Sequence, residues 1–292
     1  MSFRFLPLLI CLMLGAVAQA RPLVLAQVSD RATKDYEELR PMVQHAAAGL
    51  SDFGITSGEV RLFLTAEALV DAMRKGEVDW VTETSFTAAR LVNEAQARPL
   101  LRKWKGGLRE YRSIIYTRAD SPVRTLDDLV GQTIAFEHAD SFSSYFLPRS
   151  VLEQGGFKLR RLESLGQRPA SDQIGYLFSR NEKNNALWVD KSLTVAGALS
   201  SNDWHNPKRV PEALRAHLRI IYRSAAYPRA LELTSASLDP ALAEALRSLL
   251  LGMTPDNSPE LLQRYERTTG FEPVQPQDIA LLSDIYHRSR SW

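Results

Sequence analysis

Short runs of apolar residues alternate with amphipathic stretches along the chain after residue 20. Leu23 to Val28 is an apolar run with the length of a buried strand, and apolar positions at helical spacing follow it. The same alternation then repeats twice. The predicted strands cover residues 23–28, 60–64 and 78–81, and the predicted helices cover residues 36–50, 66–74 and 85–94. Strands that alternate with helices indicate βαβ units and a mostly parallel sheet.

A second α/β unit is predicted to begin after residue 112. An apolar run at residues 113–117 is followed by a glycine turn and another apolar run at residues 131–136. A comparable pair of apolar runs lies at residues 218–222 and 230–234. Each pair marks a place where the chain passes between units. Three helices are predicted after them, beginning at Asp239-Pro240, at Ser258-Pro259 and near residue 279.

The first twenty residues have the layout of a secretory signal peptide. One positive charge, Arg4, precedes an apolar run from Phe5 to Val17, and the small residues of Ala18-Gln19-Ala20 follow it. The run is shorter than the about 20 residues that a bilayer-spanning helix needs. We therefore expect export and cleavage after Ala20. The alternative is a buried N-terminal helix, which the lack of a polar face argues against.

The single cysteine of the chain, Cys11, lies inside this apolar run. Ile10 precedes it instead of the small residue expected at a lipidation site, so we expect no lipid anchor. Removal of 20 residues from the 292 leaves 272 without cysteine, and these can form no disulfide and no thiolate metal site. A chain of this length can be stabilised by its core alone and is long enough for two lobes.

Charge and motifs exclude several classes of function. The 36 basic and 34 acidic residues nearly balance, which argues against a nucleic-acid partner. No Gly-x-Ser-x-Gly elbow, Walker loop or dinucleotide glycine pattern is present. His138, Asp140 and Ser141 are close along the chain, but neighbours on one loop rarely face each other as a catalytic triad must. We therefore predict no enzyme, no metal site and no cofactor.

Four segments carry motifs whose order and spacing match one family. Residues 111–136 form a strand, a Ser-Pro turn, a capped helix and a second strand, and residues 72–79 contain Gly-x-Val-Asp. Residues 141–148 contain serines followed by a proline, and residues 255–271 form a helix closed by Gly-Phe. Together these segments resemble the periplasmic phosphate/phosphonate-binding proteins of ABC importers.

The resemblance extends with gaps over residues 22–275 and implies a fold. This is the α/β, two-lobed type II periplasmic-binding-protein fold. Each lobe would be a mixed, mostly parallel sheet flanked by helices, with the ligand cleft between the lobes. Lobe one would comprise residues 21–115 and 222–292, and lobe two residues 116–221.

The segment Ser141-Phe142-Ser143-Ser144 is the strongest candidate ligand loop. It follows a predicted strand and precedes a helix, so its hydroxyls and free backbone N–H groups suit an oxyanion. By the resemblance, Ser141 and Ser143 match the outer positions of the family's Ser-Thr-Ser motif, and Phe142 replaces the central hydroxyl. The alternative is a serine-rich helix cap that contacts no ligand.

The remaining candidates follow strand ends or match family positions. Thr84 lies in a loop after the third strand, beside Glu83, which stands where the family has an aromatic residue. Glu83 either binds a cationic part of the ligand, bridges to an arginine or points away. Ser29 and Thr65 follow the first two strands and either contact the ligand or cap helices. Asn181 takes the place of a histidine of the family.

These features predict a periplasmic solute-binding protein that captures a small, anionic solute such as phosphate or a phosphonate. By the resemblance, Thr194 stands where some phosphonate-binding proteins of the family have an acid for an amine group, so no aminophosphonate is predicted. The expected partner is the inner-membrane permease of an ABC importer, and we expect a monomer. Two alternatives stay open: a ligand-sensing protein that docks on a membrane sensor kinase, and a periplasmic hydrolase with this fold.

Overall fold

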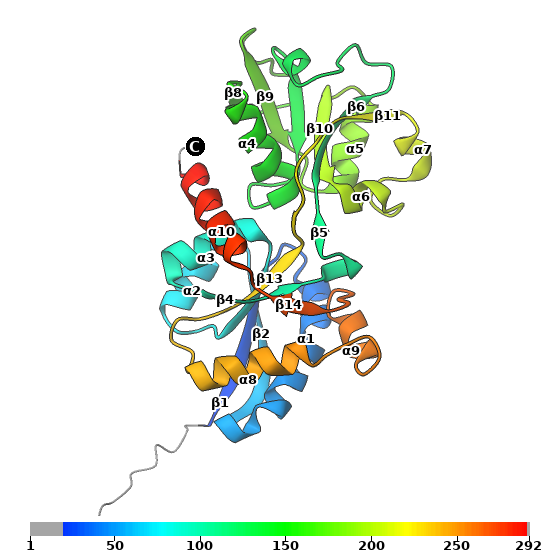
Figure 1. Cartoon of the computed structure of the whole chain (residues 1–292). Helices are drawn as coiled ribbons and strands as arrows, with labels where there is room; N and C mark the ends of the chain where they lie inside the picture. The colour runs from blue at the N-terminus through cyan, green and yellow to red at the C-terminus, as the bar shows by residue number, and fades with distance from the viewer. Residues whose placement is uncertain (1–19, 291–292) are drawn as a thin grey trace, which may run out of the picture.

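The computed structural model describes residues 20–290, which form two lobes built on separate sheets (Figure 1). The first six-stranded sheet has the order β14-β4-β13-β3-β1-β2, and the second has the order β11-β6-β10-β7-β9-β8. All strands of the second sheet lie within residues 113–223, between β4 and β13 of the first sheet. The chain therefore passes from one lobe to the other twice.

The first sheet combines parallel and antiparallel strands. Strands β1 (Arg21–Val28), β2 (Ile55–Phe63) and β3 (Trp80–Glu83) run parallel. Strand β13 (Ala230–Thr234) lies antiparallel between β3 and β4 (Arg98–Lys103), and β14 (Phe271–Pro273) pairs with β4 at the edge. Because β1 and β3 are parallel, their carboxyl ends at Val28 and Glu83 meet at one edge of the sheet.

Helices cover both faces of the first sheet. They are α1 (Ala32–Gly49), α2 (Ala66–Arg74), α3 (Ser85–Ala95), α8 (Pro240–Leu251), α9 (Pro259–Arg264) and α10 (Pro276–Ser289), with single turns η1 (Ser51–Phe53) and η2 (Lys105–Gly107). Helix α2 has the predicted bounds, whereas α10 is longer than the predicted final helix. Within residues 20–290, none of the helices combines the length and the apolar character that crossing a bilayer requires.

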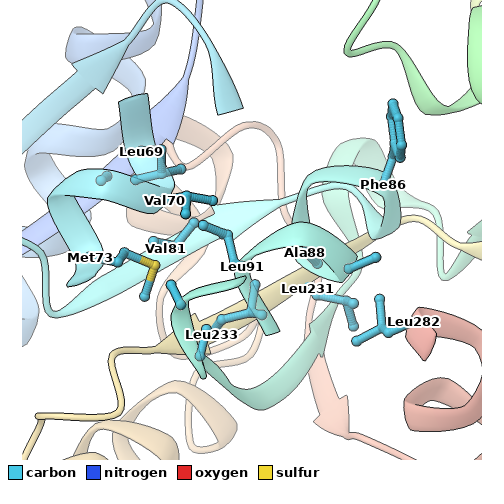
Figure 2. Packing of buried hydrophobic residues seen from close by; sticks show 14 of the residues in the cluster. Leu69, Val70, Met73, Val81, Phe86, Ala88, Leu91, Leu231, Leu233 and Leu282 are labelled. Carbon is cyan, nitrogen blue, oxygen red and sulfur yellow. The ribbon is translucent and has the colours of Figure 1, made fainter. Parts of the chain in front are cut away.

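The apolar spacing that predicts the helices also builds the core. Leu69, Val70 and Met73 project from one face of α2 toward the sheet, as Ala88 and Leu91 do from α3 (Figure 2). Burial of each large apolar side chain contributes about 1.5–3 kcal/mol. The strands and α10 complete this layer with Val81, Leu231, Leu233 and Leu282.

The second sheet has the same mixed character. Its strands are β6 (Ser113–Arg118), β7 (Thr133–Phe136), β8 (Lys158–Arg161), β9 (Gln173–Phe178), β10 (Ala196–Ser200) and β11 (Leu218–Arg223). Strands β8, β9, β7 and β10 are parallel, and β6 is antiparallel to β10 and β11. The accompanying helices are α4 (Leu147–Gln154), α5 (Glu182–Asp190), α6 (Ser201–His205) and α7 (Glu212–Arg215), with single turns η3 (Asp127–Leu129) and η4 (Phe142–Phe146), the latter π-helical.

The two passages between the lobes pair with each other. Strands β5 (Glu110–Tyr111) and β12 (Tyr227–Pro228) form a short antiparallel ribbon next to the lobe junction (Figure 1). The predicted boundaries at 115/116 and 221/222 fall inside β6 and β11. The division of the chain stays a prediction, and we propose boundaries near residues 112 and 224, just outside the second sheet.

An interlobe aromatic cluster also joins the lobes. Phe146 of η4 packs on Phe86 of α3, with ring centroids 4.7 Å apart. Phe142 contacts Tyr227 edge-on at 5.4 Å and Tyr111 at 6.2 Å. The candidate ligand loop at residues 141–144 is therefore fixed directly to the junction between the lobes.

Candidate functional site

Two connected cavities form a cleft between the lobes. The larger has a volume of about 360 Å³ and the smaller about 170 Å³. We call them the outer chamber and the inner chamber. Both are lined by both lobes, and they share Val28, Arg31, Asp35, Lys105, Glu137, His138, Asp140, Glu182, Asp203 and Arg229. The cleft lies at strand ends and helix starts, where ligands of α/β proteins bind.

Glu83 lines the inner chamber at the carboxyl end of β3. Its carboxylate accepts hydrogen bonds from the backbone N–H of Val28 at 2.7 Å and of Thr84 at 3.1 Å. Burial raises the pKa of Glu83 to about 7, although these two hydrogen bonds and the charge of Lys105 act in the opposite direction. Among the described residues Glu83 forms no ion pair with an arginine, and its hydrogen bonds are those from the two backbone N–H groups.

Ser29 lines the outer chamber, but its hydroxyl also forms hydrogen bonds within its own loop. Its hydroxyl donates to the buried carboxylate of Asp35 at 2.5 Å and accepts from the backbone N–H of Arg31 at 2.9 Å. Arg31 in turn lies 3.4 Å from Asp35. These bonds stabilise the start of α1 and hold the Arg31 guanidinium at the cleft. Arg31 lines both chambers.

A buried ion-pair network underlies the lobe-one wall. Lys103, fully buried, lies 2.6 Å from Glu266 and 3.5 Å from Glu232. Lys105 also pairs with Glu266 and lines both chambers. Burial lowers the pKa of Lys105, against the attraction of Glu266. The network therefore holds the Lys105 ammonium at the cleft wall, because its partner Glu266 is itself held by the buried Lys103.

Arg229 lines the cleft and has no anionic partner among the described residues. Its side chain makes no hydrogen bond or ion pair to any residue that the structure describes, and its Nε is buried. The guanidinium stacks 4.6 Å from the ring centroid of Tyr111 and lines both chambers. A buried donor without a partner is costly unless a ligand supplies one. Arg229 was not predicted as a ligand contact, because it follows a two-residue strand with no helix after it.

The serine loop of lobe two divides into ligand-facing and structural residues. Ser141, Phe142 and Ser143 line the inner chamber, but Ser144 does not. The Ser144 hydroxyl donates to the carbonyl of Ala198 at 2.5 Å and accepts from the N–H of Glu137 at 3.0 Å. Ser144 therefore holds the loop on its sheet, and its predicted place among the ligand contacts has no geometric support.

Ser141 also takes the capping role that was its alternative. Its hydroxyl accepts from the N–H of Ser144 at 3.2 Å and donates to the carboxylate of Glu137 at 3.0 Å. Phe142 is buried in the interlobe aromatic cluster. The missing central hydroxyl of the motif is thus replaced by a contact between the lobes.

Four acids line the lobe-two wall, namely Glu137, Asp140, Glu182 and Asp203, and none of them was a predicted ligand contact. Glu137 and Asp203 follow the ends of β7 and β10, and Glu182 begins α5. Burial raises the pKa of Glu137 well above its usual range, and the neighbouring charge of Glu182 raises it further. Glu182 also pairs with Arg209 at 2.9 Å. The rule that predicted Ser29 and Thr65, a polar residue after a strand end, would have found Glu137 and Asp203.

The other predicted residues are dispersed. Thr84 lines the inner chamber as the N-cap of α3, without a side-chain capping bond. Asn181 caps α5 through the N–H of Asn184 at 2.8 Å and lines the outer chamber. Thr65 caps α2 through the N–H of Ala68 at 3.2 Å and lines neither chamber. Residues 20–290 contain no group of three or more side chains suited to hold a metal ion.

Residues 24–279 match the family model of the periplasmic substrate-binding proteins of ABC phosphonate transporters. The chain belongs to this family. The structure is similar to XAC2383 from Xanthomonas citri bound to chloride ion, with 35% identity over 92% of this chain and 97% of that one, and a TM-score of 0.88. A structure of XAC2383 bound to ATP gives 34% identity, the same coverage and a TM-score of 0.87. PhnD1 from Prochlorococcus marinus in complex with methylphosphonate shares the fold, with 13% identity over 94% and 100% of the chains and a TM-score of 0.72.

Family membership confirms several predictions. The chain is a periplasmic substrate-binding protein of ABC transporters and not an enzyme, and it has the two-lobed type II fold. The family also implies a small-molecule ligand, a permease partner and a periplasmic location. The predicted signal peptide comprises residues 1–20, and all of it except Ala20 lies outside the described residues.

Proposed function

We propose that this protein captures a small ligand with a phosphate or phosphonate group and delivers it to the permease of an ABC importer. The observation that carries the proposal is Arg229, a guanidinium in the cleft without an anionic partner. Arginine presents a planar fork of N–H donors that matches the oxygens of such a group. The inner chamber, with about 170 Å³, has room for one oxyanion group.

Other groups around the inner chamber support an oxyanion there. Lys105 adds a second cation, and Ser143 adds a hydroxyl from the opposite lobe. Helix α3 directs its N-terminus to the chamber through Thr84, and free N–H groups at a helix start favour anions. An anion between these groups would contact both lobes and so favour their closure.

The acids of the cleft restrict which oxyanion suits it. Glu83 and Glu137 line the same chamber as Arg229 and, when ionised, would repel a ligand that offers only negative oxygens. A phosphate or phosphonate that retains a proton can donate it to such a carboxylate. The relatives support an anionic ligand, since XAC2383 is described as bound to chloride in one structure and to ATP in the other.

Calorimetry on the purified protein tests the proposal with inorganic phosphate, methylphosphonate and ATP as probes. Replacement of Arg229 by Gln removes a charge-assisted contact, so we expect affinity to fall about 10- to 100-fold, from roughly 1.5–3 kcal/mol for a hydrogen bond to a charged group. Arg160→Gln, an exposed arginine on β8, is the matched control. Equal affinity of Arg229→Gln and wild type for every bound probe would contradict the assignment.

Docking on a sensor kinase and the monomeric state remain predictions. Nothing in the cleft favours a sensory role over transport, since both need the same capture step. Light scattering of the purified protein with and without ligand tests the monomer, and a stable dimer would contradict it.

A further inference from the structure

The outer chamber is larger than a bare oxyanion needs. Its volume of about 360 Å³ lies within the range of about 300–1,000 Å³ that is usual for small-molecule sites. Arg229 and Lys105 line both chambers, but Ser143 and Thr84, which add a hydroxyl and a helix N-terminus for an oxyanion, line only the inner one. A phosphate ion bound there would leave the outer chamber empty. A ligand that fills both chambers needs a second part.

Amide side chains from lobe two line the outer chamber with hydrogen-bonding groups still available. The Asn202 side chain makes no hydrogen bond to any described residue. Asn181 and Asn206 each use the side-chain oxygen on a backbone N–H, at 2.8 Å and 3.0 Å, which leaves their NH₂ groups for another partner. Each amide NH₂ group can donate two hydrogen bonds. The three asparagines thus present donors to whatever occupies the chamber.

The lining of the outer chamber also limits the chemistry of that second part. Among the described residues it contains no Phe, Tyr or Trp, and its apolar side chains are Val28 and Leu64. An alkyl chain or a stacked aromatic ring would find little apolar surface there. Hydroxyl groups, in contrast, can both accept from the amides and donate to the neighbouring carboxylates of Asp30 and Asp203.

Backbone conformation marks the same chamber. Arg180 of lobe two and Glu266 and Arg267 of lobe one have left-handed backbones, with φ of 73°, 53° and 54°. Gln96, Ser192, Glu266 and Arg267 follow the ends of α3, α5 and α9, where this conformation is common, whereas Arg180 precedes the start of α5. Residues held in this region tend to occur at ligand sites, where the surroundings enforce the geometry. Arg180, whose left-handed backbone no helix end explains, therefore marks the lobe-two side of the outer chamber.

We propose that the outer chamber is a subsite for a hydroxyl-rich organic group joined to the phosphoryl group, so that the preferred ligand is an organophosphate of the sugar-phosphate type. The inference rests on the proposed function, because it places the phosphoryl group of the ligand at Arg229. It goes further in assigning the outer chamber and Asn202 to the organic part of the ligand.

Two phosphate monoesters with the same number of carbons show whether the outer chamber recognises hydroxyl groups or only the size of the ligand. Ribose 5-phosphate and pentyl phosphate share a phosphate monoester and a five-carbon skeleton and differ in hydroxyl groups. We expect the wild-type protein to bind ribose 5-phosphate at least about tenfold more tightly than pentyl phosphate or inorganic phosphate in calorimetry, from two or more net hydrogen bonds.

Variants of Asn202 test the subsite itself. Asn202→Ala and Asn202→Leu should weaken ribose 5-phosphate binding about three- to tenfold and leave inorganic phosphate binding unchanged. His205→Ala is the matched control, because His205 lies on the same helix, is exposed and lines neither chamber. Circular dichroism of each variant checks that α6 remains folded.

The outcomes separate this inference from the proposed function. If inorganic phosphate and methylphosphonate bind through Arg229 but pentyl phosphate equals ribose 5-phosphate, the subsite is wrong and the proposed function stands. If Asn202→Leu weakens inorganic phosphate and ribose 5-phosphate equally, the subsite is likewise wrong. If no phosphorylated probe binds the wild-type protein at all, the proposed function itself fails.

Discussion

Glu83 places a carboxyl group in a chamber that otherwise suits anions. Because the carboxyl group is buried, its ionisation lowers the stability of the folded protein, and this effect depends on pH. Its pKa of about 7 in the folded protein lies above the ordinary value of 4.5. The folded state therefore binds more protons than the unfolded state between these two values. The resulting stabilisation is complete below pH 4.5 and is lost as pH rises through 7.

This difference predicts how a Glu83 variant responds to pH. Glu83→Gln cannot ionise, so the free energy of unfolding relative to wild type should rise by about 3 kcal/mol between pH 4.5 and pH 8. The quantity to compare is the slope of this free-energy difference against pH. The Gln amide also changes the contacts with the backbone N–H groups, but that loss of stability is the same at every pH and does not affect the slope. Urea unfolding across this range measures it, with the exposed Glu163→Gln as control. Parallel curves for Glu83→Gln and wild type would contradict the shifted pKa.

At the scale of elements, most of the first lobe follows from apolar periodicity, whereas β4 does not. Its sequence, Arg-Pro-Leu-Leu-Arg-Lys, carries three cations and a proline within six residues and so reads as a loop. Arg102 and Lys103 are buried because Asp278, Glu232 and Glu266 reach them from segments more than a hundred residues away. Local patterns do not contain such partners.

The same limit explains the candidate site. Strand ends predicted the inner-chamber residues Ser141, Ser143 and Glu83, because parallel strands place their carboxyl ends together. Capping accounts for Thr65 and for the bonds of Ser141, and one sequence cannot separate a hydroxyl that caps a helix from one that binds a ligand. Arg229 depends on the pairing of β5 with β12, which only the folded chain shows.

Lys103 gives a prediction for β4. Lys103→Met removes the cation between two buried carboxylates, so we expect a loss of about 3–5 kcal/mol in the free energy of unfolding. A second change, Glu266→Gln, should restore part of it by removing one uncompensated charge. Urea unfolding of the single and double variants measures both effects. A Lys103→Met protein as stable as wild type would show that the network does not support this wall.

At the scale of the whole molecule, the interlobe aromatic cluster predicts that lobe closure contributes to binding. The ring contact between Phe86 and Phe146 joins α3 to η4 across the junction, and Arg288 of α10 lies 5.5 Å from the Phe146 ring centroid. An aromatic pair contributes about 0.5–1.5 kcal/mol beyond its area. Loss of this contact should lower the population of the closed arrangement and with it the apparent affinity.

Phe146→Leu tests this coupling, because it keeps an apolar side chain but removes the ring. We expect affinity for a bound phosphorylated probe to fall about two- to tenfold, and the radius of gyration of the free protein in X-ray scattering to increase. Phe136→Leu removes a ring within the core of lobe two and is the control. A Phe146→Leu variant that loses stability but keeps its affinity would mean that the cluster persists in open and closed arrangements alike.

The place of β13 in the first sheet has a consequence for how the protein is made. β13 lies between β3 and β4, yet it follows both in sequence, after all six strands of the second sheet. As the chain emerges from its N-terminus, β3 and β4 have no neighbour on their facing edges until residues 230–234 arrive, and exposed strand edges invite aggregation. The inserted segment 113–223, in contrast, has all its own strands by that time. We therefore expect the sheet of the inserted segment to be completed before the sheet that surrounds it in sequence.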